Sequence, residues 1–282
     1  MIEYIKAILF GIVEGITEWL PVSSTGHLIL LDEFVRLDVS EAFYEMFQVV
    51  IQLGAILAVI VLFFHKLNPF SPQKTAPQKK DTWSLWGKVV AAVIPSALVG
   101  VLLDDWMDAH LYNYFVVALM LIGYGIAFLF VEKWNEKRTV AVADVGSITY
   151  KTALRMGAFQ CRSLIPGTSR SGSTIMGAII LGASRSAGAE FSFFMAIPTM
   201  LGASGLKLLK YVVDIQDGGA VAPNQTEIGV LVVGCVVSFL VSLAVIRGLM
   251  EYVRKHNFSI FGVYRIVLGV LGLGYFAITN LL

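Results

Sequence analysis

The sequence predicts an all-α polytopic membrane protein with about six transmembrane helices and two re-entrant helix-turn-helix hairpins in inverted-topology repeats. Hydrophobic residues make up 57% of the 282 residues and charged residues only 15%, too little polar surface for a soluble protein of this size. Six apolar runs are long enough to span a bilayer, and two more are interrupted at the middle. We therefore expect one integral membrane domain covering residues 1–282.

The six expected spans are separated by polar or charged connections. They lie at about 43–64, 86–103, 113–131, 190–211, 228–246 and 258–281.

Two apolar stretches, 4–35 and 150–184, do not qualify as spans. The first is broken by LPVSSTGH and the second by IPGTSRSG. We expect each to form a helix, a polar turn at membrane depth and a second short helix that returns to the same side. Such a turn is stable only if it is buried in protein or lines a wet cavity.

The distribution of Lys and Arg predicts the orientation. Twelve of them lie in the segments 65–88, 132–151 and 247–257. Four lie in the other set of connections, 1–6, 28–42, 104–112 and 207–226. The first set is therefore expected in the cytoplasm, with both termini outside and the hairpins entering from opposite faces. No long basic run exists, so nucleic acid is not an expected partner.

A repeat supports this geometry. A shift of 146 positions places Gly11 on Gly157, Ser23 on Ser169 and Gly26 on Gly172. Three spans separate the two hairpins, and because this number is odd the halves, about 1–131 and 150–282, are expected to be inverted relative to each other. Inverted repeats with broken helices commonly build a polar site where the breaks meet.

Glu14 and Glu18 are the acids of the first hairpin. They are four residues apart, so on one helix they share a face. This pair is suited to holding a hard cation or to dividing base and electrostatic roles. The alternative is two glutamates that point into a wet vestibule without catalytic work.

The segment Pro21–His27 adds hydroxyls and an imidazole. Ser23, Ser24 or Thr25 is suited to capping the returning helix, and uncapped N–H groups at its start attract an anion. A serine hydroxyl beside the His27 imidazole can be activated as a nucleophile. Taken alone, such a segment is more often a plain helix cap with a packed histidine.

The second break, Pro166–Thr174, places Arg170 at a helix start among serines and threonines. A permanently charged guanidinium inside a membrane needs an anion, and its planar fork matches phosphate. The alternative is a structural ion pair with Glu14 or Glu18. Both roles are possible together, because an ion pair with a glutamate can hold Arg170 in position before the phosphate binds.

Three motifs, GIVEGITEWLPVSSTGH, FQVVIQLGAILAV and PGTSRSGST, together resemble the bacterial undecaprenyl-diphosphate phosphatases of the bacitracin-resistance type. The resemblance covers essentially the whole chain. It implies a multi-pass enzyme of the bacterial cytoplasmic membrane that removes the terminal phosphate of the C55 polyprenyl diphosphate carrier. It further implies an assisting divalent cation and a site open to the outer face.

The resemblance and the residues together suggest roles. Ser24 is the preferred nucleophile, with His27 as its general base or as the acid that protonates the leaving oxygen. Ser23 as nucleophile and direct attack by His27 remain alternatives. Mg²⁺ or Ca²⁺ is expected between Glu14 and Glu18 because both ions prefer oxygen ligands. The expected phosphate contacts come from both turns: Ser23, Thr25, Gly26, Ser169, Arg170, Ser171 and Thr174.

A secondary transporter or flippase of a phosphorylated lipid has the same predicted architecture. A transporter needs no hydroxyl beside a histidine, so its turnover would survive Ser24→Ala far better than hydrolysis would. A structural scaffold leaves Arg170 and the two acids unexplained. The expected partners are the polyprenyl diphosphate substrate and membrane lipid, and a homodimer is left open.

Overall fold

The computed structural model describes residues 1–111 and 113–279, and its long elements are all α-helices. Six candidate membrane spans are found in this described part, as predicted. They are formed by α3 and α4 together (Glu41–Val50 and Gln52–Leu62), α6 (Ala76–Leu111), α7 (Tyr114–Asn135), α10 (Arg185–Gln216), α11 (Gln225–Lys255) and α12 (Ser259–Thr279).

Helix α6 begins earlier than the sequence analysis predicted. Its first residue is Ala76, whereas the predicted span starts at 86, so part of the connection expected at 65–88 is helical. Thr75 and Gln78 cap this start reciprocally: the Thr75 N–H donates to Gln78 Oε1 at 2.9 Å and the Gln78 N–H to Thr75 Oγ1 at 3.5 Å. The four-residue helix α5 (Phe64–Leu67) precedes the shortened loop.

Two pairs of short helices correspond to the predicted hairpins. The first pair is α1 (Ile2–Thr17) and α2 (Ser24–Phe34). The second is α8 (Tyr150–Gln160), which continues into the 3-10 turn η2 (Cys161–Leu164), and α9 (Arg170–Ile180). The partners in each pair contact each other, and each helix is shorter than the roughly 20 residues needed to cross a bilayer. A further 3-10 turn, η1 (Val145–Ser147), precedes α8.

The two turns are built alike. Ser23 and Ser169 have φ angles of 76° and 74°, in a region that residues with a side chain rarely adopt. Each of these serines accepts a hydrogen bond from the backbone N–H three residues later, that of Gly26 or Gly172. Such backbone conformations cost about 1–3 kcal/mol each and persist only where the surroundings hold them in place.

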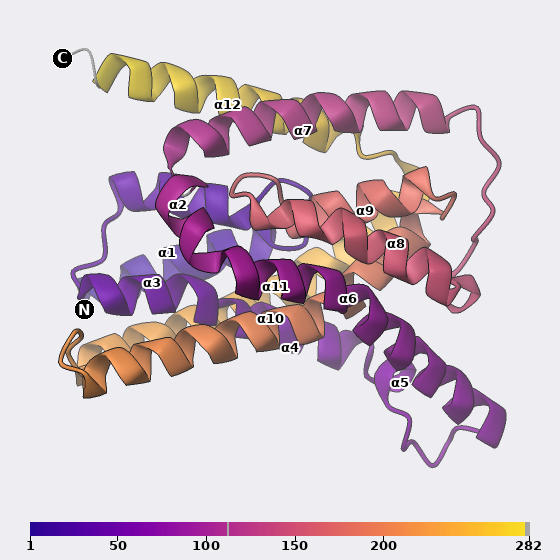
Figure 1. Cartoon of the computed structure of the whole chain (residues 1–282), viewed down its shortest axis with the longest axis horizontal. Helices are drawn as coiled ribbons and strands as arrows, with labels where there is room; N and C mark the ends of the chain where they lie inside the picture. The colour runs from indigo at the N-terminus through magenta and orange to yellow at the C-terminus, as the bar shows by residue number, and fades with distance from the viewer. Residues whose placement is uncertain (112, 280–282) are drawn as a thin grey trace.

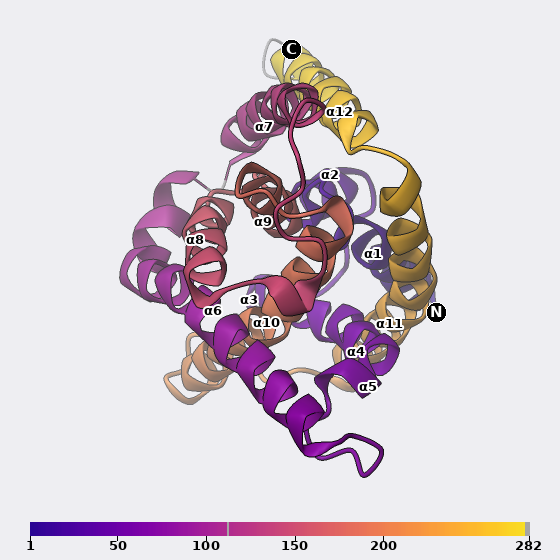
Figure 2. The same ribbon diagram turned by 90° about the vertical axis from the view of Figure 1, so that its right-hand side faces the viewer.

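The second helix of each hairpin, α2 or α9, begins inside a ring of the other helices, as the view along the bundle shows (Figure 2). Every residue of α9 from 171 to 179 is buried, whereas α2 is buried mainly in its first turn. Helix α1 packs against α11 and α8 against α6, so each hairpin rests on a long helix of the other half of the chain. Helices α7 and α12 lie side by side along one flank (Figure 1).

Glycine makes two of these helix contacts close. A Cβ on Gly157 would lie 1.9 Å from the Ala92 carbonyl oxygen, and one on Gly54 would lie 2.0 Å from that of Cys235. Small residues that let two backbones approach are typical of helix packing in membranes.

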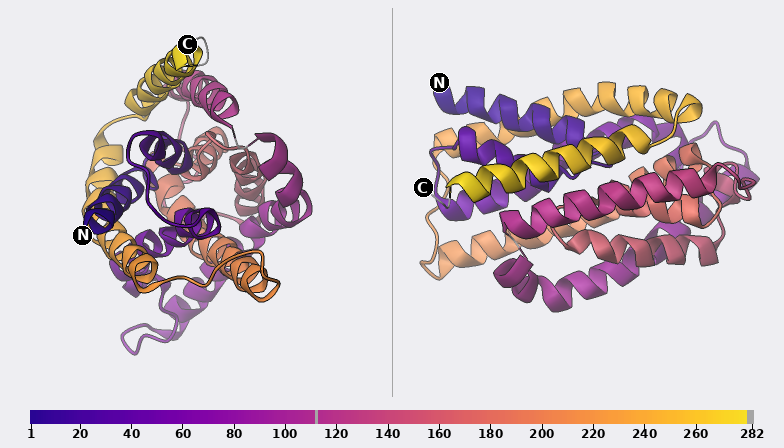
Figure 3. Two further views of the ribbon diagram at one scale, coloured as in Figure 1. Left: turned by 90° about the vertical axis from the view of Figure 1, so that its left-hand side faces the viewer. Right: turned by 90° about the horizontal axis from the view of Figure 1, so that it is seen from above.

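The two ends of the bundle separate the termini from the Lys- and Arg-rich loops, as the predicted orientation requires. The start of α1 and the end of α12 lie at one end (Figures 1 and 3), and the loops at 68–75 and 136–149 lie at the other (Figure 1). Large apolar side chains such as Leu102 and Phe130 are exposed on the flanks, where lipid would cover them. Which end faces outside, and the re-entrant placement of the hairpins in a bilayer, stay predictions.

Candidate active site

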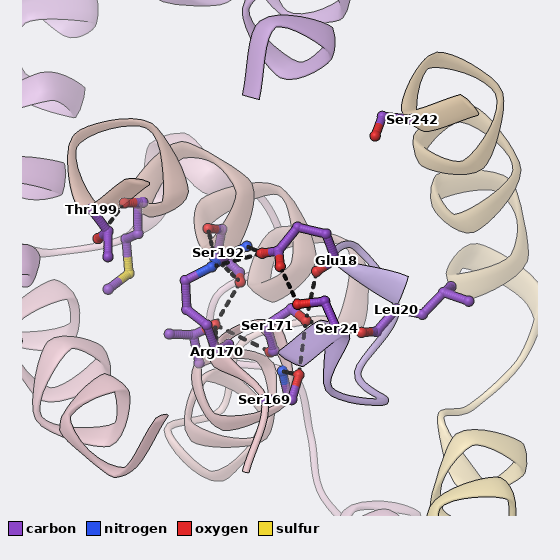
Figure 4. A network of polar contacts seen from close by, with 12 residues as sticks. Glu18, Leu20, Ser24, Ser169, Arg170, Ser171, Ser192, Thr199 and Ser242 are labelled. Carbon is purple, nitrogen blue, oxygen red and sulfur yellow. Dashed lines mark hydrogen bonds and ion pairs between the residues drawn. The ribbon is translucent and has the colours of Figure 1, made fainter. Parts of the chain in front are cut away.

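Ser24 and Glu18 form the shortest polar contact between the ends of the first turn. The Ser24 hydroxyl donates to Glu18 Oε2 at 2.6 Å, and both side chains are buried (Figure 4). Glu18 follows directly after α1, and Ser24 is the first residue of α2. The turn therefore folds a carboxylate onto the hydroxyl at the start of the next helix.

Arg170 joins this pair from the second turn. Its Nη2 donates to Glu18 Oε1 at 3.0 Å and its Nε to the same oxygen at 3.3 Å. Its Nη1 donates to the carbonyl oxygen of Ser192 on α10 at 2.8 Å. Of the two predicted ion-pair partners of Arg170, Glu18 is the one it contacts, and this pairing offsets part of the cost of burying both charges.

The two turns are also bonded to each other directly. The Ser171 hydroxyl lies 3.2 Å from the carbonyl oxygen of Glu18 and 3.1 Å from that of Leu20, both in the first turn (Figure 4). The Thr174 hydroxyl lies 2.5 Å from the hydroxyl of Ser192. Ser169 lies 3.2 Å from Ser171. The Ser171 contacts hold the start of α9 against the end of α1, and the Thr174 contact holds α9 against α10.

The starts of α2 and α9 supply the anion-binding character of this region. Ser24 and Arg170 are the first residues of these helices, and they are related by the shift of 146 positions. Backbone N–H groups in the first turn of a helix lack partners within the helix and attract negative charge. At equivalent positions, the first turn thus supplies the Ser24 hydroxyl and the second turn the Arg170 guanidinium. Both groups lie at helix N-termini, which carry partial positive charge.

His27 does not contact the Ser24 hydroxyl. Its Nδ1 lies 2.7 Å from the Ser23 carbonyl oxygen, and its Nε2 lies 2.7 Å from the hydroxyl of Tyr264 on α12. The two rings are stacked, with centroids 5.6 Å apart. The three-residue spacing put His27 and Ser24 on one helix face, but the ring turns back to the carbonyl four residues before it. The group that accepts the Ser24 hydrogen bond is Glu18.

Glu14 is the unpartnered acid of this site. It is fully buried, and neither of its carboxylate oxygens has a hydrogen-bond partner among the described residues. A buried carboxylate left in this state is costly unless a proton, a cation or water satisfies it. The counterpart of Glu14 at the shift of 146 is Gln160, which donates to Ser96 at 2.6 Å, so the acids belong to the first turn alone.

The predicted cation fits these donors in part. Glu14 and Glu18 supply the oxygen atoms that Mg²⁺ and Ca²⁺ prefer. Within the described part of the chain, no group of three or more His, Cys, Asp or Glu residues is placed to hold a metal. A cation at Glu14 would therefore need ligands beyond these side-chain types, such as hydroxyl or carbonyl oxygens or those of a phosphate.

The remaining predicted residues, Thr25 and Gly26, lie in the first helical turn of α2. Thr25 is half-buried in the first turn of α2, and Gly26 is buried there with its N–H bonded to Ser23. The sequence analysis missed Ser192, Tyr264 and Arg265. Arg265 had a usable signal, since it is the one charged residue in the predicted span 258–281, and charge inside a span is by default functional. A serine and a tyrosine in apolar spans carry no such signal.

Comparison with known proteins gives one family. Residues 7–271 match the family model described as bacitracin resistance protein BacA. Several relatives that match nearly the whole chain carry the name undecaprenyl-diphosphatase. The protein of Streptococcus thermophilus is 58% identical over 278 residues, covering 99% of this chain and 95% of the relative.

Two further relatives carry the same name. The protein of Enterococcus faecalis is 54% identical over 270 residues, covering 96% of each chain. The protein of Lactiplantibacillus plantarum is 56% identical over 280 residues, covering 99% of this chain and 100% of the relative. The similarity therefore extends over both hairpins and all six candidate spans.

Proposed function

The chain belongs to the bacitracin resistance protein BacA family, and from this membership we propose that it is a membrane phosphatase that hydrolyses undecaprenyl diphosphate to undecaprenyl phosphate and inorganic phosphate. The observation that carries the proposal is the buried network of Ser24, Glu18 and Arg170. It combines a hydroxyl, a base in contact with it and a cation at one spot. Phosphoryl transfer depends mainly on such positioning and charge stabilisation.

In the first step, the Ser24 oxygen attacks the terminal phosphorus of the diphosphate. Glu18 Oε2 takes the hydroxyl proton along the 2.6 Å hydrogen bond. The bond from this phosphorus to the bridging oxygen breaks, and undecaprenyl phosphate leaves with the electron pair. The phosphoryl group is then carried on Ser24 as a phosphate ester.

Arg170 stabilises the charge on the transferred group. Its guanidinium is held by Glu18, and this contact weakens when Glu18 becomes neutral by accepting the proton. The planar fork is then free to bind two phosphate oxygens. The proton transfer thereby couples activation of the hydroxyl to release of the cation that the transition state needs.

In the second step, water attacks the phosphorus of the ester. The bond between this phosphorus and the Ser24 oxygen breaks, and the Ser24 oxygen takes a proton from the attacking water. Inorganic phosphate leaves, and Glu18 returns its proton to solvent. His27 lies one helical turn from Ser24 and is bonded through both ring nitrogens, to the Ser23 carbonyl oxygen and to the Tyr264 hydroxyl.

Glu14 and Glu18 would hold the divalent cation. It would neutralise part of the charge of the diphosphate, which these two acids would otherwise repel. The unpartnered oxygens of Glu14 support this assignment.

The prenyl chain needs an apolar path along the protein. A small apolar hollow of about 10 Å³ beside α2 is lined by Ile29 and Leu30 of this helix, by Val117 and Leu121 of α7, and by Leu268 of α12. Because α2 carries Ser24 at its start, we propose that the part of the prenyl chain next to the diphosphate passes this apolar surface. The multi-span fold supports a bacterial cytoplasmic membrane location, and we propose that the site opens to the outer side.

Recycling of the carrier for cell-wall synthesis, and resistance to bacitracin, follow from this activity. The test is phosphate release from undecaprenyl diphosphate by the purified protein in detergent, with and without chelator. Release that depends on enzyme, and that Glu18→Gln abolishes, supports the proposal. Transport of the intact diphosphate across vesicles without phosphate release would overturn it.

A further inference from the structure

Arg265 on α12 is a buried arginine whose partners are backbone carbonyls. Its side chain has no exposed surface, and no ion pair of Arg265 is found in the described part of the chain. By contrast, the partly buried arginines Arg170 and Arg185 each pair with a glutamate. A guanidinium kept in a membrane without a counter-ion requires a reason.

The guanidinium bonds to both turns at once. Its Nη1 donates to the carbonyl oxygen of Pro21 in the first turn at 2.9 Å. Its Nη2 donates to the carbonyl oxygens of Gly167 and Thr168 in the second turn at 2.8 and 2.9 Å. The two arms of one planar group therefore connect the breaks of the two hairpins.

The bonded carbonyls stand directly beside the strained residues. Pro21 lies two residues before Ser23, and Thr168 lies immediately before Ser169, the two non-glycine residues with positive φ in the described chain. A Cβ on Gly172, in the first turn of α9, would lie 3.2 Å from Nη1. Arg265 thus contacts both turns where their strained conformation must be held and where the helices of the site begin.

We propose that Arg265 is a positioning residue that holds the two turns in one frame, so that Ser24 of the first turn and Arg170 of the second meet the same phosphate. The proposal rests on the phosphatase function. Arginine is required because two arms must point to two separate turns, whereas the ammonium of lysine is a single point. The residue does not touch the diphosphate and acts through the backbone.

The test compares Arg265→Lys and Arg265→Gln with a matched control, Arg185→Lys. Arg185 is the first residue of α10 and is bonded to Glu132 on α7, and it makes no contact with Ser24, Glu18 or Arg170 among the described interactions. Steady-state kinetics per folded molecule are measured together with thermal unfolding. We expect kcat to fall about 10- to 100-fold in both Arg265 variants, because small misplacements of reacting groups have effects of this size. KM should stay within about threefold of the wild-type value.

Hydrogen exchange supplies a readout that does not depend on activity. Amides at 21–27 and 167–173 should exchange faster by about tenfold or more in Arg265→Lys, and not in Arg185→Lys. Where Arg265→Gln fails to fold, the lysine variant decides.

Unchanged kcat in a folded Arg265→Lys variant, or unchanged exchange in both turns, would overturn the proposal. A fall in thermal stability with normal kinetics would show a purely structural role and would also overturn it. If the wild-type protein released no phosphate, the proposed function would fail, while the exchange measurement would still decide whether Arg265 holds the turns.

Discussion

Ser23 and Ser24 are adjacent serines to which the fold gives different tasks. Ser23 has a positive φ and caps α2, so its side-chain oxygen is used by the Gly26 N–H. Ser24 is the first residue of the helix, and its hydroxyl points to Glu18. The sequence analysis preferred Ser24 as nucleophile, with Ser23 and His27 as alternatives, and the contact with Glu18 is consistent with that preference.

Replacing Ser24 by Ala should lower hydrolysis about a thousandfold or more, because the attacking oxygen is lost. Folding and diphosphate binding should be nearly unchanged, since little packing is removed. Single-turnover kinetics and thermal unfolding of the purified variant measure both. Adding Glu18→Gln should cost little more, because the two groups act as a unit.

Ser23→Ala is the comparison for this variant. It should lower stability by about 1 kcal/mol through loss of the cap, while keeping measurable hydrolysis. Hydrolysis within about tenfold of wild type in Ser24→Ala, with Ser23→Ala inactive, would move the nucleophile to Ser23. Survival of both variants would leave His27 as the attacking group.

Arg170→Lys keeps the charge and removes the fork. Activity should fall about 10- to 100-fold or more, since charged hydrogen bonds are worth about 1.5–3 kcal/mol each. The expected change appears in kcat/KM measured on vesicles or in detergent. Near-normal turnover in this variant would show that Arg170 is structural and that its ion pair with Glu18 is its whole role.

At the scale of the elements, the position of each hairpin depends on the helix of the other half that it packs against. Helix α8 approaches α6 so closely at Gly157 that no side chain fits there. Because η2 and the second turn follow α8 directly, this contact helps to set the depth of Arg170. Packing between helices therefore reaches the site through short connections.

Gly157→Ala should destabilise the protein by about 1–3 kcal/mol, because the new methyl group would overlap the Ala92 carbonyl and force α8 and α6 apart. Thermal unfolding in detergent measures the change. Gly202→Ala on α10 is the matched control, since a Cβ there meets nothing within 4 Å. This control should be neutral or stabilising by up to about 1 kcal/mol. Equal stability of the two variants would show that the close approach is not required.

At the scale of the whole molecule, the chain crosses between its halves: α1 packs on α11 and α8 on α6. The site needs both turns, with the acids and Ser24 from one and Arg170 from the other. Neither half alone carries the complete network.

The topology prediction concerns the two ends of this molecule. Cysteine in place of Gln73, exposed in the loop before α6, should react only with reagent supplied from the cytoplasm. Cysteine in place of Val221, 75% exposed in the loop between α10 and α11, should react from outside. The measurement is labelling by a membrane-impermeant maleimide in intact cells, with the parent chain and its two native cysteines as the background control. The opposite pattern would reverse the orientation and place the site on the inner side.

The sequence by itself determined the number of helices that span, the positions of the two breaks and the residue types of the site. These follow from local physical properties. Apolar runs must be about 20 residues long to cross a bilayer, and a proline with glycines and serines ends a helix wherever it occurs. The cluster around Glu14, Glu18 and Arg170 stood out because charge is costly in such surroundings.

Only the tertiary structure decided which of these residues meet. Spacing along one helix suggested His27 as the partner of Ser24, but the turn folds Glu18 onto the hydroxyl and sends the imidazole to Tyr264, 237 residues away in the chain. Arg265 likewise reaches Pro21 across 244 residues. Contacts of this range depend on how whole helices pack, and a pattern of neighbouring residues carries no information about them.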